Sequence, residues 1–264
     1  MNIDLSTRHA IVTGSTAGIG LAIATGLAQS GAAVVITGRT QARVDEAIAA
    51  VKKAAPNAKV TGVAADLGTA EGAAALIASV PDTDILINNL GIFEPKDFFD
   101  IDDAEWTRFF EVNVNSGVRL SRHYAKGMKD RGWGRVQFIS SESAVQIPGE
   151  MVHYGVTKTA QLGVSRGLAE VLSGTGVTVN AVLPGPTLSE GVSDFFAKIA
   201  KDQGKSQEEV ERDFIQTHRP TSLIKRLLSV EEVANVSVYL ASEQASGTTG
   251  AAIRVDGGVT RSII

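Results

Sequence analysis

The chain has 264 residues, and its 25 basic and 29 acidic side chains give it a formal net charge of -4. This length suffices for a large core, and we expect one α/β domain that spans residues 1–264. The basic residues are scattered rather than clustered, which argues against nucleic-acid binding. Because the chain has no cysteine, disulfides, thiol nucleophiles and thiolate metal sites are excluded.

The first residues, 1–6, contain neither a basic segment nor an apolar run of the kind found in secretory signals. No later stretch approaches the apolar length that a membrane span needs. We therefore expect a soluble, cytoplasmic protein that does not bind membranes.

Short apolar runs alternate along the chain with longer segments that carry Ala, Leu and Ile at helical spacing. This alternation predicts a doubly wound (Rossmann) fold of about seven parallel strands flanked by helices on both faces. The predicted strands are 10–13, 34–37, 60–64, 85–88, 136–140, 177–183 and 253–255. The predicted helices lie near 18–30, 41–54, 70–79, 104–130, 151–172 and 230–241.

One segment, residues 188–228, interrupts the alternation. It has no strand candidate and mixes charged residues with aromatic ones, among them Phe195 and Phe196. An excursion of this length in a compact domain usually serves a function. We interpret it as the lid or wall of a substrate site.

A glycine-rich turn joins the first predicted strand to the first helix. It reads Thr13-Gly14-Ser15-Thr16-Ala17-Gly18-Ile19-Gly20, which is not the G-x-G-x-x-G spacing but stands where a dinucleotide-binding loop belongs. Glycines allow a tight turn and the close approach of a pyrophosphate, and the helix N-terminus adds N–H donors and partial positive charge. The alternative is a glycine-rich turn without a ligand.

Arg39 follows the second predicted strand, where a dinucleotide site recognises the adenosine ribose. An acidic residue there would bind the free 2′-hydroxyl of NAD, whereas an arginine can form paired, charge-assisted bonds to the 2′-phosphate of NADP. The sequence therefore favours NADP over NAD. A solvated arginine without a ligand is the alternative.

Tyr154 and Lys158 stand four residues apart in a predicted helix and so share one face. A cation within a few Å lowers the pKa of a phenol by roughly 1 to 3 units, from an ordinary value near ~10. The pair is a candidate proton-transfer device. An exposed helix face with a buried ring is the alternative, because this spacing also arises by chance.

Further short motifs follow one another in a recognisable order. With the glycine-rich turn, they resemble the short-chain dehydrogenase/reductase family over essentially the whole chain. The resemblance implies an NAD(P)-dependent oxidoreductase that transfers hydride between the nicotinamide and a carbonyl or secondary alcohol. The motifs are Asn88-Asn89-Leu90-Gly91, Asn113, Ser141, Tyr154, Lys158, Pro184-Gly185 and Val255-Asp256-Gly257-Gly258.

The resemblance also implies four catalytic residues. Tyr154 would be the general acid or base, and Lys158 would lower the Tyr154 pKa and bond the nicotinamide ribose. Ser141 would hold the substrate oxygen, with Ser140 and Ser143 as neighbouring alternatives. Asn113 would kink its helix and hold a water that connects Lys158 to solvent, with Asn115 as its near competitor.

The resemblance also implies cofactor contacts along the chain, from the turn after the first predicted strand to the segment after the sixth. Asp66 would accept a bond from the adenine amino group, unless it only caps the helix that begins near Thr69. Thr187 and Ser189 are both candidates for the nicotinamide carboxamide, and Leu90 replaces the family's usual alanine. The full set is Gly14, Ser15, Thr16, Gly18, Ile19, Gly20, Arg39, Asp66, Leu67, Asn89, Gly91, Tyr154, Lys158, Pro184, Gly185, Thr187 and Ser189.

No metal is expected, because His9, His123, His153 and His218 lack zinc-site spacing. The partner would be a small carbonyl or alcohol substrate. We expect its pocket to be walled by Ile92 and Phe93, residues 142–147, Met151 and Val152, and Phe195 and Phe196. We interpret Glu142 as a solvated turn charge, with selection of a polar or cationic substrate group as the alternative.

Several functions remain open from the sequence. Within enzymes, a 3-oxoacyl thioester reductase and a sugar or polyol dehydrogenase both fit the motifs. A noncatalytic NAD(P)-binding sensor or scaffold is the alternative outside enzymes, although the intact Ser141, Tyr154 and Lys158 set argues against it. The family resemblance further implies a homotetramer or homodimer packed through the long helices near 104–130 and 151–172.

Overall fold

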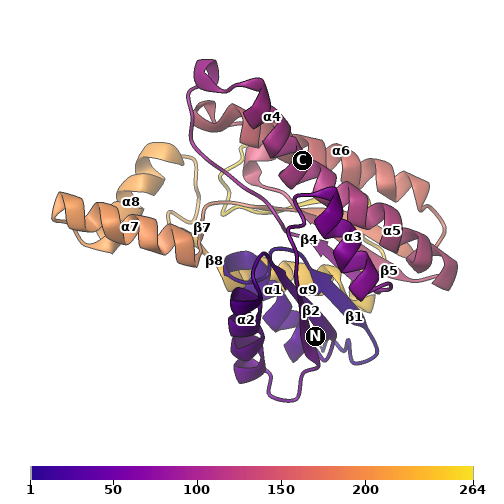
Figure 1. The fold of residues 1–264 in the computed structure, drawn as a ribbon. Helices are drawn as coiled ribbons and strands as arrows, with labels where there is room; N and C mark the ends of the chain where they lie inside the picture. The colour runs from indigo at the N-terminus through magenta and orange to yellow at the C-terminus, as the bar shows by residue number, and fades with distance from the viewer. Residues whose placement is uncertain (1, 264) are drawn as a thin grey trace.

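The computed structural model describes residues 2–263, except for the side chains of Asp194 and Phe195. Seven parallel strands form one sheet in the order β3-β2-β1-β4-β5-β6-β9 (Figure 1). The predicted fold is confirmed, and each predicted strand end lies within two residues of the observed one. The strands are β1 (His9–Val12), β2 (Ala33–Gly38), β3 (Val60–Ala64), β4 (Ile85–Asn88), β5 (Gly134–Ile139), β6 (Val177–Pro184) and β9 (Ala252–Val255).

The sheet reverses its winding direction between β1 and β4, which pair directly. From β1 the chain builds outward through β2 and β3, and then returns to place β4, β5, β6 and β9 on the other side. Ligands of such sheets bind outside the carboxyl ends of the strands at this reversal. The topology therefore places the glycine-rich turn after β1 at the expected binding crevice.

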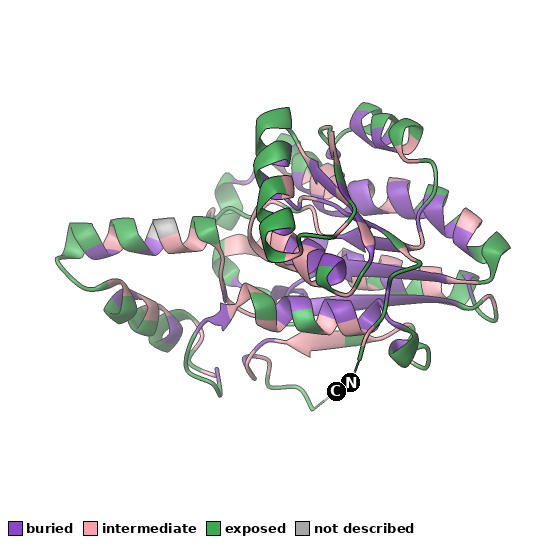
Figure 2. Ribbon diagram, turned by 90° about the horizontal axis from the view of Figure 1, so that it is seen from below, coloured by how far each residue is buried: buried purple, intermediate pink, exposed green. Residues whose placement is uncertain are grey.

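Helices cover both faces of the sheet and bury two apolar clusters against it. One cluster joins the sheet to α1, α2 and α9, and the other joins it to α3, α5 and α6. In Figure 2 the buried residues concentrate on the sheet and on the helix sides that face it. Strands β4, β5 and β6 are buried throughout, so the polar Arg135 and Gln137 of β5 find internal partners, the carbonyls of Ser242 and Ser237. The helices are α1 (Gly18–Gln29), α2 (Gln41–Ala54), α3 (Ala70–Ser79), α5 (Ser116–Arg131), α6 (Val152–Val171) and α9 (Val230–Leu240).

The long helix predicted near 104–130 is interrupted. It consists of α4 (Asp103–Phe110), a π-helical turn η2 (Glu111–Asn115) and α5. The predicted kink at Asn113 corresponds to this turn. Single π turns inside α-helices often mark functional sites, because they displace backbone carbonyls from the regular ladder.

The excursion after β6 is a helix pair that projects from the body of the molecule (Figure 1). It comprises α7 (Glu190–Gln203) and α8 (Gln207–His218), bracketed by the paired short strands β7 (Thr187–Leu188) and β8 (Leu228–Ser229). The pair has a small core of its own, formed by Phe196, Ala200, Val210, Ile215 and Leu227. The sequence analysis found no helices here, because that core is too small to set a clear apolar period over the whole segment.

None of the helices within residues 2–263 combines the length and apolar character that a bilayer crossing requires.

Candidate active site

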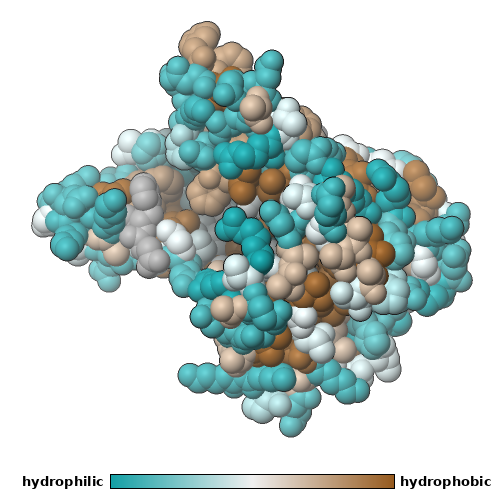
Figure 3. Space-filling view, viewed as in Figure 1, coloured by the Kyte–Doolittle hydropathy of each residue, from teal (hydrophilic) through white to brown (hydrophobic). Residues whose placement is uncertain are grey.

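A pocket of about 510 Å³ opens at the carboxyl ends of the strands, between them and the α7–α8 pair. Figure 3 shows this face of the molecule hollowed beside the projecting helices. Twelve of the predicted site residues line the pocket, namely Gly18, Ile19, Gly20, Asn89, Gly91, Ser141, Tyr154, Lys158, Pro184, Gly185, Thr187 and Ser189. The pocket does not reach Gly14, Ser15, Thr16, Arg39, Asp66, Leu67 or Asn113.

The glycine-rich turn forms a cradle that has no room for side chains. A Cβ on Gly20 would lie 2.5 Å from both the Gly14 carbonyl oxygen and Asn89 Nδ2. Asn89 Nδ2 fixes the turn by donating to the carbonyls of Thr13 and Gly14 at 2.9 and 3.0 Å. Gly14 and Gly18 adopt φ of +59° and +55°, which glycine tolerates best.

The first turn of α1 is free to bind an anion. Within the described residues, its N-cap Ala17 supplies no side-chain cap, and the turn carries no acidic residue. The N–H groups at such a helix start lack intrahelical partners and carry partial positive charge. The cradle and the helix start therefore fit the pyrophosphate of a dinucleotide cofactor.

Two other residues of the turn stabilise it rather than face the pocket. Ser15 is fully buried, donates from Oγ to the Val12 carbonyl at 2.7 Å and accepts from the Thr37 amide at 2.9 Å. Thr16 packs under Gly38, where a Cβ would lie 2.4 Å from Thr16 Cγ2. Both residues hold the turn against the end of β2.

Two of the adenosine-end candidates, Arg39 and Asp66, are exposed. Arg39 follows β2 and has no hydrogen bond or ion pair to any described residue, so its guanidinium is available. Asp66 Oδ1 accepts from the Gly68 amide at 3.1 Å. The helix α3 is capped by Thr69, whose Oγ1 accepts from the Gly72 amide at 3.0 Å, so Asp66 is not its cap. The neighbouring Leu67 is a core residue.

Tyr154 and Lys158 lie on the pocket side of α6, and the Lys158 ammonium stands 5.6 Å from the centre of the Tyr154 ring. The buried Nζ donates to the Ile139 carbonyl at the end of β5, at 2.9 Å. Ser140 Oγ donates to the Lys158 carbonyl at 2.8 Å, which occupies this serine in joining β5 to α6.

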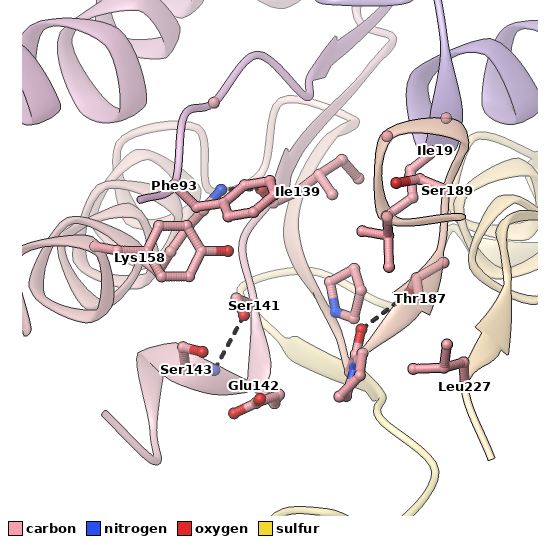
Figure 4. Close-up of a pocket in the computed structure, with 18 of the residues that line it drawn as sticks. Ile19, Phe93, Ile139, Ser141, Glu142, Ser143, Lys158, Thr187, Ser189 and Leu227 are labelled. Atoms are coloured by element: carbon pink, nitrogen blue, oxygen red, sulfur yellow. Dashed lines mark hydrogen bonds between the residues drawn. The ribbon is translucent and has the colours of Figure 1, made fainter. Parts of the chain in front are cut away.

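Ser141 presents its hydroxyl to the same pocket, on the same side as Lys158 (Figure 4). Its Oγ accepts from the Ser143 amide at 3.1 Å, and its hydroxyl also interacts with that of Tyr154. Of the three neighbouring serines, Ser140 is bonded to the backbone and Ser143 interacts with the Glu142 carboxyl group, whereas Ser141 is the one that interacts with the Tyr154 hydroxyl.

Burial controls the ionisation of Tyr154 and Lys158 in this structure. It raises the pKa of Tyr154 to about 12, and the hydrogen bond with Ser141 only opposes this. It lowers the pKa of Lys158 to about 8. The predicted lowering of the Tyr154 pKa by Lys158 is wrong for this structure, because loss of hydration of the buried phenolate dominates and Lys158 is not among the groups that shift the Tyr154 pKa.

Asn113 connects the π turn to the loop after β4 and to α6. Its Oδ1 accepts from the Ile92 amide at 2.8 Å, and its Nδ2 donates to the Ile92 carbonyl and to Thr157 Oγ1 at 3.0 and 2.9 Å. Its backbone carbonyl accepts from Gln161 Nε2 at 2.5 Å. The predicted competitor Asn115 bonds Glu111 instead. Asn113 thus positions the loop and helix around Lys158.

Thr187 and Ser189 line the opposite side of the pocket (Figure 4). Thr187 Oγ1 donates to the Gly185 carbonyl at 2.9 Å. Ser189 is the N-cap residue of α7, but its side chain makes no capping hydrogen bond. Its Cβ lies close to the glycine-rich turn, 3.2 Å from the position that a Cβ on Gly18 would take. Both residues face the pocket from the segment that follows Pro184.

Glu142 is buried, which corrects its interpretation as a solvated turn charge. It is only 3% exposed and receives a hydrogen bond from Arg219 Nε to its Oε1 at 2.8 Å. The sequence analysis missed Arg219, which follows Glu142 by 77 residues and reaches it from the end of α8. No spacing rule connects residues that only the folded excursion brings together.

The predicted apolar walls are partly present. Ile92, Phe93, Met151 and Phe196 line the pocket, and Phe214 and Leu227 join them from the excursion. The prediction for Val145 and Ile147 is wrong, since both side chains are exposed outside the pocket, and Val152 does not line it either. The side chain of Phe195 lies outside the described part of the structure.

Known proteins resemble this chain over its full length. A family model described as enoyl-(acyl carrier protein) reductase matches residues 14–260. The uncharacterised oxidoreductase YvaG of Bacillus subtilis is 49% identical over 263 residues, covering 100% of both chains. Dehydrogenase/reductase SDR family member 4 of Oryctolagus cuniculus is 36% identical over 262 residues, covering 96% of this chain and 94% of that protein. The chain belongs to the short-chain dehydrogenase/reductase family.

Solved members of the short-chain dehydrogenase/reductase family share the fold closely. L-sorbose reductase from Gluconobacter frateurii, complexed with NADPH and L-sorbose, has a TM-score of 0.92 and 34% identity, with 100% of both chains covered. A putative NAD(P)-dependent gluconate 5-dehydrogenase from Beutenbergia cavernae, with bound NADP, has a TM-score of 0.86 and 31% identity, covering 99% of this chain and 100% of that one. This short-chain dehydrogenase/reductase is an NAD(P)-dependent oxidoreductase that acts on alcohol and carbonyl groups.

Proposed function

We propose that this enzyme is an NADP-preferring reductase of ketone groups on small polyhydroxylated substrates of the sugar or polyol class. One observation carries the proposal: a single pocket joins the glycine cradle to Ser141, Tyr154 and Lys158. The resemblance to an L-sorbose reductase complexed with NADPH and L-sorbose supports both the cofactor and the substrate class.

In this proposal Tyr154 is the proton donor for reduction. Its raised pKa keeps the phenol protonated near neutral pH, as an acid must be before it transfers its proton. Ser141, whose hydroxyl interacts with Tyr154 in this structure, would donate its proton to the carbonyl oxygen and stabilise the negative charge that develops there. The bound nicotinamide supplies the hydride. The buried Lys158 ammonium, held by the Ile139 carbonyl, adds positive charge beside the phenol.

The cofactor would lie along the glycine cradle, with its pyrophosphate at the first turn of α1. Thr187 and Ser189 would hold its nicotinamide end, and Asp66 its adenine. Arg39 supports the NADP preference, because an exposed and unpaired guanidinium beside the cradle can receive the 2′-phosphate.

The proposed assembly is a homotetramer or homodimer. Helix α6 supports it, because Gly163 and Gly167 are exposed on its surface with nothing within 4 Å of their Cβ positions. Small residues of this kind let a second helix approach closely.

A substrate panel followed by nicotinamide absorbance tests the function. L-sorbose, D-fructose, 5-ketogluconate, simple ketones and acetoacetyl-coenzyme A are each offered with NADPH and with NADH. We expect reduction of the ketoses, faster with NADPH. Reduction of the thioester alone would replace the proposal with a 3-oxoacyl thioester reductase.

Replacing Tyr154 with Phe tests the catalytic assignment. Tyr154→Phe removes the proton donor and leaves the cradle intact, so kcat should fall by about 10²- to 10⁴-fold. NADPH affinity, measured by fluorescence titration, should stay within about twofold of wild type by the same reasoning. Tyr239→Phe, in α9 and outside the pocket, is the matched control and should keep full activity. Near-normal turnover by Tyr154→Phe would exclude this mechanism.

A further inference from the structure

Glu142 holds one carboxylate oxygen without a partner. Its Oε1 is bonded by Arg219, but its Oε2 is buried and has no hydrogen-bond partner among the described residues. Both residues line the same pocket as Ser141 and Tyr154. Buried polar atoms in native proteins are nearly always paired. Ser143 interacts with this carboxyl group and lowers its pKa, but no hydrogen bond from a described residue reaches Oε2, so a molecule that enters the pocket can supply that partner.

Arg219 holds the carboxylate in place from the other side of the pocket. It ends α8, and besides the bond from Nε to Glu142 it donates from Nη1 to the His218 carbonyl at 2.8 Å and lies 3.7 Å from Glu150. These contacts fix the guanidinium, which in turn fixes the direction of Glu142. Burial raises the pKa of Glu142 and Arg219 opposes this rise, but a carboxyl group can bond a hydroxyl whether or not it is ionised.

The charge balance of the pair indicates what it can bind. Arg219 cancels the charge of Glu142, so a cationic group gains little there, and an anionic group would face the free carboxylate oxygen. A neutral hydroxyl suits the pair, because it donates one hydrogen bond without adding charge. A water can occupy this position in the free enzyme, and a substrate hydroxyl can take its place.

The position of Glu142 limits where that hydroxyl stands on the substrate. Glu142 directly follows Ser141, and the two side chains lie on one wall of the pocket (Figure 4). Their Cα atoms are consecutive and about 3.8 Å apart, so the two side chains reach the pocket from neighbouring points of its wall. A carbonyl oxygen at Ser141 therefore brings groups on the nearest carbons toward Glu142.

We propose that Glu142 is a specificity residue, whose Oε2 binds a hydroxyl group carried within two carbons of the reacting carbonyl, and that Arg219 is its positioning residue. This proposal rests on the ketone reductase function above. It narrows the substrates from ketones in general to hydroxyketones.

Matched substrates test the proposal, because butanone differs from hydroxyacetone only by a methyl in place of the hydroxyl. A second pair is L-sorbose and its analogue that lacks the hydroxyl on the first carbon. For wild type, we expect kcat/KM to be at least about 10-fold higher for the hydroxylated member of each pair.

Three variants test whether the preference for hydroxylated substrates depends on Glu142 and Arg219. The double variant Glu142→Leu with Arg219→Met removes both charges together, so that no charge is left buried and unpaired. Its preference for the hydroxylated substrate of each pair should fall to about twofold or less. In Glu142→Gln, the amide oxygen would stay with Arg219 and the NH₂ would replace Oε2, so the preference should fall partway. Glu150→Gln weakens only the outer contact to Arg219, and since Glu150 does not line the pocket, the preference should be kept.

The outcomes separate the two proposals. Equal kcat/KM values for both members of each pair in wild type, or an unchanged preference in Glu142→Gln, would overturn the role of Glu142 and leave the reductase function standing. If wild type reduces none of these ketones with either cofactor, the proposed function fails and the role of Glu142 fails with it. Melting temperatures and NADPH titrations show that each variant is folded, and Glu142→Gln decides the matter if the double variant is not.

Discussion

Lys158 shows how far the surroundings of a side chain determine its chemistry. The residue is 4% exposed, and its ammonium donates to one backbone carbonyl, that of Ile139. The spacing to Tyr154 fixes which helix face the two residues share, but the pKa of each follows from loss of water. Burying this ammonium costs free energy, and we expect that cost to lower the stability of the cofactor-free enzyme.

Stability should therefore depend on pH through Lys158. Burial lowers the pKa of Lys158 from 10.5 to about 8, so below about pH 8 the ammonium is protonated in both the folded and the unfolded chain. In that range the folded state is destabilised by the full free energy of burying the charge. That cost is about 3 kcal/mol. Between the two pKa values the unfolded chain binds more protons, so wild type should gain stability with rising pH relative to Lys158→Met. Urea unfolding without cofactor measures this difference, and parallel pH profiles would contradict it.

Arg39 is the residue for which charge alone should decide cofactor choice. Arg39→Asp removes the proposed phosphate ligand and adds a carboxylate that can bond a free 2′-hydroxyl, so the ratio of kcat/KM for NADPH over NADH should fall by at least about 10-fold. Arg43→Asp, on the exposed side of α2 beside Glu46, is the control and should leave the ratio near that of wild type. An unchanged ratio in Arg39→Asp would show that this residue does not recognise the phosphate.

At the scale of elements, α1 and its glycine turn act as one unit. The turn is packed so tightly against Asn89 that a single methyl group has no space at Gly20. Because the N–H donors of the first turn depend on this geometry, a small displacement there should affect cofactor binding as well as folding.

Gly20→Ala should weaken NADPH binding by at least about 10-fold and lower stability by roughly 1–3 kcal/mol, because the new Cβ meets the Gly14 carbonyl at 2.5 Å. Gly247→Ala is the control, since a Cβ at this exposed position meets nothing within 4 Å, and it should leave NADPH affinity unchanged and stability within about 0.5 kcal/mol of wild type. Fluorescence titration and urea unfolding measure both effects. Normal NADPH affinity in Gly20→Ala would contradict the cradle.

The π turn between α4 and α5 marks a limit of sequence analysis at this scale. The apolar period of 104–130 predicts one helix, and that period survives a single wide turn. Only the contacts of Asn113 with Ile92, Thr157 and Gln161 show why the helix widens there. Those partners come from the β4 loop and from α6, which local periodicity cannot connect.

At the scale of the whole molecule, the sheet and its helices leave two features outside the compact body. The α7–α8 pair projects beside the pocket and supplies Arg219, Phe214 and Leu227 to it. Helix α6 turns exposed glycines away from the sheet. The first feature bears on substrate choice, and the second on assembly.

Assembly through α6 can be tested with a bulky charge. Gly163→Glu should dissociate the proposed oligomer, because a buried and unpaired carboxylate in a helix interface costs several kcal/mol. Gly247→Glu, at an exposed position with nothing within 4 Å, is the control and should keep the mass of wild type. Sedimentation or light scattering measures the mass. An oligomer that persists in Gly163→Glu would place the interface elsewhere.

The sequence by itself determined the order of the seven sheet strands and of the helices that cover them, because buried parallel strands are short and mostly apolar, and surface helices repeat their apolar residues every three to four positions. It also determined the glycine cradle and the Tyr154–Lys158 spacing, since those are local. Only the tertiary structure decided the ionisation of that pair and the partnership of Glu142 with Arg219. Burial and long-range contact depend on residues that meet in space, and no local pattern records which ones will meet.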